Sequence, residues 1–207
     1  MTTMTVRMTS LHAPADKLSS PPTTSTLEEL VEALRCGREG ALEKLIKKTE
    51  KACYHLALSI LKDPDLSKDA LQEAYFLVYR RVGQLREPAA FKGWLYRIVS
   101  SCCYDILRKR SNEVETDIAE REDLLGSEAD KKPVSDPSSE VSNREHIRST
   151  FDDLPEIDRQ ALCLREVCSL SYEEMSRVLR VPIGTVRSRL AKARKRFINA
   201  YRKEQHS

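Results

Sequence analysis

Residues 171–196 read SYEEMSRVLRVPIGTVRSRLAKARKR, and they predict two helices joined by a tight turn. Ser171 followed by Glu174 forms the S-x-x-E pattern of a capping box, which predicts that a helix begins here. Pro182 cannot continue that helix and restricts the residue before it, so the sequence predicts a tight turn. A second helix is predicted from about Gly184. Two helices joined by so short a turn are typical of a helix-turn-helix, whose second helix commonly enters the major groove of DNA.

The predicted second helix has an apolar side and a basic side. At about 100° per residue, one narrow stripe collects the apolar residues Val186, Leu190, Ala193 and Phe197. Six basic and no acidic residues lie between 184 and 196, and Arg194 and Arg196 among them suit phosphates. The residues that we expect to contact duplex DNA are Thr185, Arg187, Ser188, Arg189, Lys192 and Lys195. The alternative is a solvated basic helix without a partner, because such helices are common.

The net charge of +3 over 207 residues hides a segregation of charge along the chain. Residues 27–110 carry a net +4 and residues 144–207 a net +5, whereas residues 111–143 hold ten acidic and three basic side chains. Basic blocks favour a polyanionic partner, and the acidic stretch between them is typical of a flexible linker. Residues 1–26, rich in Ser, Thr and Pro, predict a disordered tail.

Helical periodicity fills both basic blocks, so we expect an all-α fold of two small helical domains joined by the acidic linker. In the first block the expected helices span 27–37, 40–62, 65–82 and 91–110. In the second, helices at 144–152 and 156–168 precede the helix-turn-helix. No apolar run approaches the roughly 18 residues that cross a membrane, and no apolar signal core is visible, which predicts a cytoplasmic protein.

The helix predicted at 65–82 presents a polar stripe that contains an aromatic residue. Opposite its apolar side lie Asp69, Gln72, Glu73 and Phe76. Because interfaces combine aromatic anchors with polar rims, this stripe predicts a partner surface. The alternative is an isolated exposed phenylalanine, which is ordinary on protein surfaces.

The helix predicted at 91–110 carries what we call the aromatic-basic face. Its members are Trp94, Tyr96, Arg97, Ser100, Ser101, Tyr104 and Arg108. Rings can stack on unpaired bases while guanidinium groups hold the backbone, so this face predicts binding of single-stranded nucleic acid. The alternative is that the aromatic rings are structural and partly buried.

Together these segments resemble the extracytoplasmic-function (ECF) sigma factors, which are bacterial transcription initiation factors. DALQEAYFLVYR at 69–80 resembles the motif of this family that docks on the polymerase clamp helices. FKGWLYRIVSSCCYDILRKR at 91–110 resembles its segment that opens and captures the minus-ten element. LPEIDRQALCLREVCSLSYEEMSRVLRVPIGTVRSRLAKARK at 154–195 resembles its domain that binds the minus-thirty-five element.

The resemblance implies a role for each surface. The stripe at 69–76 would contact core RNA polymerase, specifically the clamp helices of the largest subunit. Loop 85–92 and the aromatic-basic face would hold the displaced strand of promoter DNA, and helix 184–196 would lie in the major groove. The linker would run toward the RNA exit path. An anti-sigma protein wedged between the two domains commonly inhibits members of this family.

Two positions depart from the pattern of the family. Ser101 replaces a usual asparagine, and serine offers fewer hydrogen-bonding groups to a captured base. Arg180 replaces a usual glycine at the turn between the helices. A left-handed conformation costs an arginine about 1–2 kcal/mol, so either the turn is altered or that cost is tolerated.

The remaining sequence features point away from catalysis. The chain shows no Ser-His-Asp set, no metal-ligand cluster and no phosphate-binding glycine loop, so we expect no enzymatic activity, cofactor or metal. The six cysteines are expected to be reduced buried thiols, with a zinc or redox site as the less favoured alternative. Two other hypotheses stay open: a helix-turn-helix regulator that acts on duplex DNA without polymerase, and an interaction adaptor without salt-sensitive DNA affinity.

Overall fold

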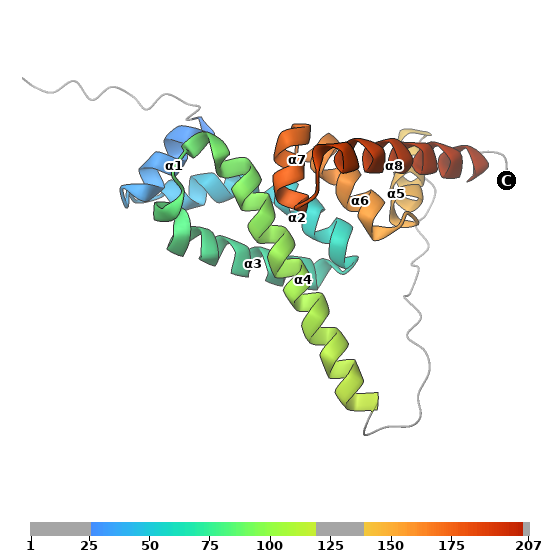
Figure 1. Ribbon diagram of the computed structural model, residues 1–207, viewed down its shortest axis with the longest axis horizontal. Helices are drawn as coiled ribbons and strands as arrows, with labels where there is room; N and C mark the ends of the chain where they lie inside the picture. The colour runs from blue at the N-terminus through green and yellow to red at the C-terminus, as the bar shows by residue number, and fades with distance from the viewer. Residues whose placement is uncertain (1–25, 119–138, 205–207) are drawn as a thin grey trace, which may run out of the picture.

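The computed structural model describes residues 26–118 and 139–204, and within these ranges it is helical with no strand. The predicted N-terminal tail and most of the predicted linker therefore lie outside the described residues. No helix in the described ranges is long and apolar enough to cross a membrane. The all-α prediction is confirmed, and the helices form two lobes that Figure 1 shows beside each other.

The first lobe contains four helices and two short 3-10 turns. Its elements are α1 (Leu27–Arg35), α2 (Ala41–Leu61), α3 (Pro64–Arg81), η1 (Val82–Gln84), η2 (Pro88–Ala90) and α4 (Phe91–Ile118). Thr26 caps α1 through a capping box with Glu29, and the carboxylate of Asp63 accepts the first free amides of α3. These two helices therefore begin within one residue of the predicted bounds.

Helix α4 is longer than predicted. It continues to Ile118, eight residues beyond the expected end at 110, because residues 111–118 contain neither glycine nor proline. The first part of the acidic segment is therefore helical instead of extended. Figure 1 shows this end of α4 projecting away from both lobes.

The second lobe contains four helices and one π-helical segment. Its elements are α5 (Ser139–Asp152), α6 (Glu156–Leu162), η3 (Cys163–Val167), α7 (Tyr172–Leu179) and α8 (Ile183–Glu204). Helix α5 begins five residues earlier than the predicted 144. The single helix expected at 156–168 instead changes to π geometry at Cys163, with the amide of Cys168 donating to the carbonyl of Cys163 at 2.9 Å.

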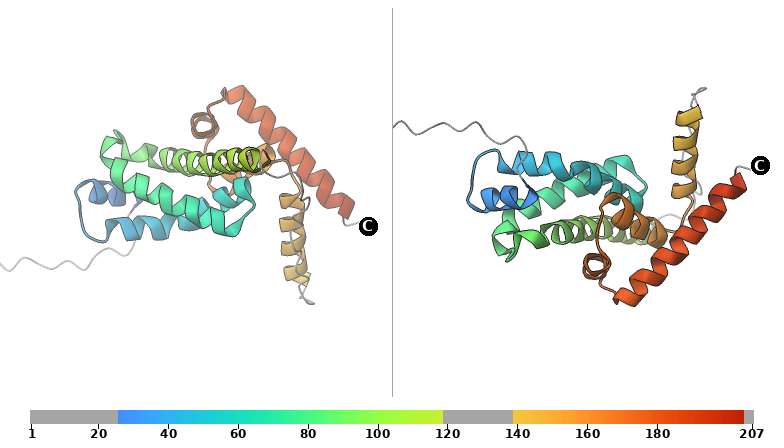
Figure 2. Two further views of the ribbon diagram at one scale, coloured as in Figure 1. Left: turned by 90° about the horizontal axis from the view of Figure 1, so that it is seen from below. Right: turned by 90° about the horizontal axis from the view of Figure 1, so that it is seen from above.

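The two lobes pack directly against each other and share one apolar core. Helix α7 contacts α4, while α6 and η3 contact α2. The buried residues of both lobes form one continuous cluster, to which Leu56 and Phe91 contribute from the first lobe and Leu164 and Met175 from the second. Figure 2 shows from both sides that the second lobe lies along α4 and α2. The sequence did not indicate this closed arrangement.

Candidate nucleic-acid interface

The helix-turn-helix forms as predicted, and its turn contains a strained residue. The amide of Ser171 donates to Glu174 Oε2 at 2.7 Å, and the amide of Glu174 donates to Ser171 Oγ at 3.2 Å, which completes the capping box. Arg180 ends α7 in the left-handed region, with φ 53° and ψ 43°. The hydroxyl of Ser176 donates to the carbonyl of Val181 at 2.6 Å and so fixes the turn. The chain therefore tolerates the conformational cost at Arg180.

Helix α8 presents the predicted outer face to solvent. Val186, Leu190 and Ala193 are buried against α6 and α7, which confirms the apolar stripe. Among the candidate DNA contacts, the exposed residues are Arg187, Ser188, Lys192 and Lys195. Thr185 and Arg189 are half-buried at the edges of this face. The hydroxyl of Ser188 donates to the carbonyl of Thr185 at 3.0 Å, so this side chain lies close to the helix. The helix surface there can approach the base edges in a DNA major groove.

Two arginines of α8 hold the second lobe together instead of standing free. Arg194 pairs with Glu166 at 2.8 Å, and Arg196 pairs with Asp158 at 2.5 Å. The Asp158 side chain is only 4% exposed, so Arg196 neutralises a buried carboxylate. Both arginines were expected to contact DNA phosphates. Their carboxylate partners lie in η3 and α6, and the sequence pattern of α8 does not reveal that these segments lie beside it.

The polar stripe of α3 is fully accessible. Its four predicted members, Asp69, Gln72, Glu73 and Phe76, are all exposed, and the Phe76 side chain is 53% exposed. The guanidinium of Arg80 lies 5.5 Å from the centre of the Phe76 ring, within cation–π range. Tyr79, 61% exposed, extends the same surface. Sequence reasoning missed Tyr79, although its position three residues after Phe76 places both rings on one side of the helix.

The aromatic-basic face of α4 is divided between solvent and the lobe interface. Arg97, Ser101 and Arg108 are exposed, and Trp94 is half-buried against Phe91. Arg108 also forms an ion pair with Asp105, one turn before it on the same helix.

Of the other three members of that face, two contact the second lobe and one is buried. Tyr96 is only 3% exposed and interacts with the thiol of Cys168, and Ser100 is also buried. Tyr104 is 41% exposed, but its hydroxyl donates to Gln160 Oε1 at 3.2 Å, and partial burial raises the pKa of Tyr104 to about 12. In this conformation the complete face is not available to a ligand.

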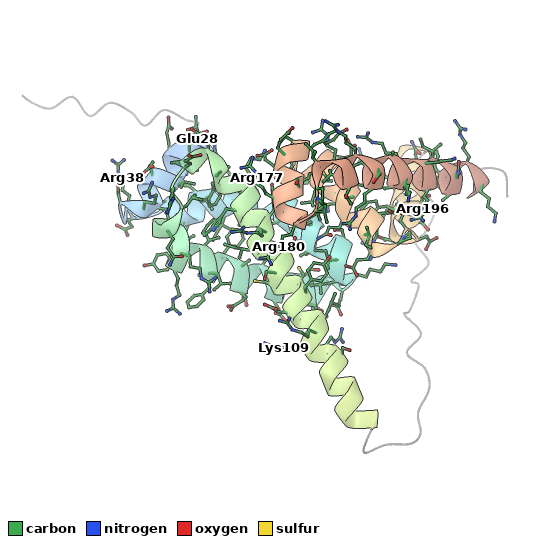
Figure 3. The ribbon with its side chains drawn as sticks, viewed as in Figure 1. Glu28, Arg38, Lys109, Arg177, Arg180 and Arg196 are labelled. Atoms are coloured by element: carbon green, nitrogen blue, oxygen red, sulfur yellow. The ribbon has the colours of Figure 1, made fainter. Side chains whose placement is uncertain are left out.

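A small pocket of about 370 Å³ lies between the loop before α4 and the helix-turn-helix. Its walls include Leu85, Trp94 and Arg97 from the first lobe, and Glu174 and Arg177 from α7. Figure 3 labels Arg177 on α7, beside the N-terminal half of α4. The loop that was expected to hold the displaced strand therefore opens toward the second lobe.

The cysteines are free thiols, as predicted, and all except Cys36 are buried. Within residues 26–118 and 139–204, no group of His, Cys, Asp and Glu side chains is arranged to hold a metal ion. Burial raises the pKa of Cys53 to about 12, which makes this thiol a poor nucleophile.

Comparison with known proteins decides the family. Residues 45–113 match sigma-70 region 2, and residues 144–197 match sigma-70, region 4. The ECF RNA polymerase sigma-E factor of Escherichia coli K12 is 32% identical over 180 residues, which cover 84% of this chain and 93% of that protein. The chain belongs to the ECF sigma factors. This sigma factor is also 33% identical over 172 residues to the RNA polymerase sigma-H factor of Pseudomonas aeruginosa, covering 81% and 89% of the two chains.

Solved structures share the fold of this sigma factor. The sigma factor RpoE, in complex with the anti-sigma factor NepR from Bartonella quintana, has a TM-score of 0.63 at 21% identity, covering 77% of this chain and 96% of that chain. CnrH, in complex with the cytosolic domain of CnrY, has a TM-score of 0.59 at 17% identity, covering 84% and 95%. The predicted family is thus confirmed, and the hypothesis of a regulator without polymerase is not supported.

Proposed function

We propose that this sigma factor binds core RNA polymerase through α3, holds unpaired promoter DNA on α4 and places α8 in the major groove of the minus-thirty-five element. The observation that carries the proposal is that one chain presents an exposed anchor surface, an aromatic-basic helix and a helix-turn-helix in this order. The proposed sigma factor catalyses no reaction itself and acts in the cytoplasm.

The α3 stripe suits a polymerase surface because it offers a protruding ring within a polar rim. Phe76 supplies apolar area, while Asp69 and Glu73 supply negative charge around it. Such an arrangement matches the anchor and rim of protein interfaces, and its charges favour a basic partner helix. The exposed ring of Tyr79 belongs to the same surface.

The two DNA surfaces differ in what they recognise. On α8, Arg187 and Ser188 face outward from a helix with small neighbours, so they suit base edges, whereas Lys192 and Lys195 suit phosphates. On α4, stacking needs rings that reach bases freed from the duplex. Promoter melting then follows from differential affinity, because this face binds unpaired bases and not the intact duplex.

We also propose an anti-sigma partner that occupies an apolar groove spanning both lobes. The groove encloses about 750 Å³ and is lined by Tyr54 and Leu58 of α2, Phe151 of α5, and Phe197 and Ile198 of α8. An apolar helix seated here would hold both lobes at once. One structural neighbour, the sigma factor RpoE, is likewise in complex with an anti-sigma factor, NepR. A two-hybrid screen with Ile198→Glu as the negative control tests the site. Partners that bind this variant equally would contradict it.

In vitro transcription tests the proposed function directly. Purified protein is added to core polymerase with a library of randomised promoters, and the starts of the transcripts are sequenced. We expect initiation at templates that share two short elements with a fixed spacing. Initiation without any sequence preference, or none above core polymerase alone, would refute the proposal.

A further inference from the structure

The turn of the helix-turn-helix carries an exposed arginine beside the start of α8. We propose that Arg180 is a further DNA contact of this sigma factor, and that it binds a backbone phosphate at the edge of the major groove. This role rests on the proposed function, because it requires that α8 enters that groove. Arg180 then contributes to affinity and to its salt dependence, but not to the choice of base.

The turn brings Arg180 close to the end of α8 that enters the groove. Arg180 ends α7, and only Val181 and Pro182 separate it from Ile183, the first residue of α8. In a helix-turn-helix the first residues of the second helix contact base edges, while the first helix crosses the DNA backbone. The major groove is about 12 Å wide, so a long side chain at this turn can reach the phosphates along its edge.

Exposure alternates along the turn and places Arg180 on its solvent side. Arg180, Pro182 and Gly184 are exposed, whereas Val181 and Ile183 are half-buried. Val181 packs against the apolar core, which anchors the turn. Gly184 lies opposite the buried stripe of α8, so Arg180 is exposed together with the outer face that the proposed function turns toward DNA.

The guanidinium of Arg180 has no hydrogen-bond or ion-pair partner among residues 26–118 and 139–204. By contrast, Arg194 pairs with Glu166, and Arg196 pairs with Asp158. Two cations of α8 that were expected to contact phosphates are therefore paired within the protein. Arg180 is a cation of the same lobe that remains available to DNA.

The backbone at Arg180 is strained, although a smaller residue would relieve the strain. Its φ of 53° and ψ of 43° lie in the left-handed region, which glycine adopts without steric cost and arginine does not. Strained residues that are not glycine cluster at functional sites. A phosphate contact by the side chain would offset the unfavourable backbone, whereas a side chain that contacts nothing would not.

Lys62 provides a matched comparison for a purely structural role. It is exposed and ends α2 with φ 57° and ψ 8°, and its amide donates to the carbonyl of Leu58, as that of Arg180 donates to Ser176. Both residues place a positive charge at a helix C-terminus, where the helix dipole favours a cation. A structural role therefore predicts the same behaviour for both residues, and a phosphate contact predicts a difference for Arg180 alone.

Counterion release gives the size of the expected effect. Each phosphate that a protein neutralises on duplex DNA contributes about −0.9 to the slope of log K against log salt concentration. Arg180→Gly should therefore make that slope shallower by about 0.9. If the contact contributes nothing at about 1 M salt, binding becomes about eightfold weaker at about 0.1 M and about twofold weaker at about 0.4 M. Arg180→Lys keeps the charge and should keep the slope.

The experiment is a salt titration of holoenzyme binding to a duplex promoter selected by in vitro transcription. Fluorescence anisotropy at saturating core polymerase compares wild type, Arg180→Gly, Arg180→Lys and Lys62→Gly, on the promoter and on the same duplex with a scrambled minus-thirty-five element. Unfolding of each variant in urea is measured in parallel. We expect both glycine variants to resist urea better and only Arg180→Gly to show the shallower slope. Arg180→Gly should still prefer the intact element, because phosphate contacts carry no sequence information.

The outcomes separate failure of the Arg180 contact from failure of the proposed function. An unchanged slope for Arg180→Gly, an equal change for Lys62→Gly, or a lost preference of Arg180→Gly for the intact element would overturn the phosphate contact and leave the proposed function intact. Wild-type holoenzyme that binds the scrambled duplex as tightly as the promoter would refute the placement of α8, and the Arg180 contact with it.

Discussion

Truncation of Phe76 is the most informative test of the polymerase surface. A phenylalanine side chain buries about 150–250 Å² when fully covered. Since 53% of Phe76 is exposed in the free protein, about 100 Å² remains for a partner to cover. At about 25 cal/mol per Å², Phe76→Ala should weaken polymerase binding by about 2.5 kcal/mol, or about 70-fold. The fold should survive, because the lost cation–π contact with Arg80 contributes only about 0.5–1 kcal/mol.

The assay is a titration of fluorescently labelled sigma factor with core polymerase. Ile157→Ala is the control, because Ile157 lies in the second lobe and is also 53% exposed. We expect a loss of one to two orders of magnitude for Phe76→Ala and no change for the control. Binding of Phe76→Ala within twofold of the wild type would refute the anchor role.

Four further outcomes follow from the structure. Arg180→Gly should raise the free energy of unfolding by about 1 kcal/mol in urea titrations, because Arg180 has a φ of 53°; a loss of stability would contradict the strain. Arg196→Ala should lower it by about 1–2 kcal/mol, since Asp158 stays buried without its partner; an unchanged midpoint would show that the pair contributes nothing. Burial raises the pKa of Cys53 from 9.0 to about 12, so the free energy of unfolding should be independent of Cys53 ionisation below about pH 9 and should fall by about 1.4 kcal/mol per pH unit from pH 9 to 12. If the difference in free energy of unfolding between wild type and Cys53→Ala stays constant from pH 9 to 11, this prediction is wrong. Lys192→Ala should reduce the salt slope of holoenzyme binding to duplex promoter by about one, and an unchanged slope would place Lys192 away from phosphate.

Local signals predicted the helices well, and they predicted the helix ends except in the acidic segment and at Cys163. The capping box at Ser171 and Glu174 and the proline at 182 gave the helix-turn-helix, because short-range hydrogen bonding and backbone geometry decide these features. The apolar stripe through Val186 and Leu190 followed from helical periodicity alone. The exposed stripe around Phe76 was equally local, since the opposite side of α3 carries its apolar residues.

Features that depend on distant segments were not predictable. The ion pairs of Arg194 and Arg196 use partners 28 and 38 residues away. Burial of Tyr96 depends on the second lobe, whose position no pattern within α4 specifies. The π-helical turn at Cys163 was not predicted either, because an apolar helical pattern does not distinguish α-helical from π-helical hydrogen bonding.

In the proposed function one lobe holds unpaired bases while the other binds intact duplex, and both act on core polymerase. Permanganate probing of the holoenzyme on a promoter selected in vitro tests it most directly, with DNase I footprinting of the same complex. We predict reactive unpaired thymines around the minus-ten element and a protected duplex around the minus-thirty-five element, only when core polymerase is present. Protection at the upstream element without core polymerase, and with no unpaired thymines in any complex, would refute this division of roles.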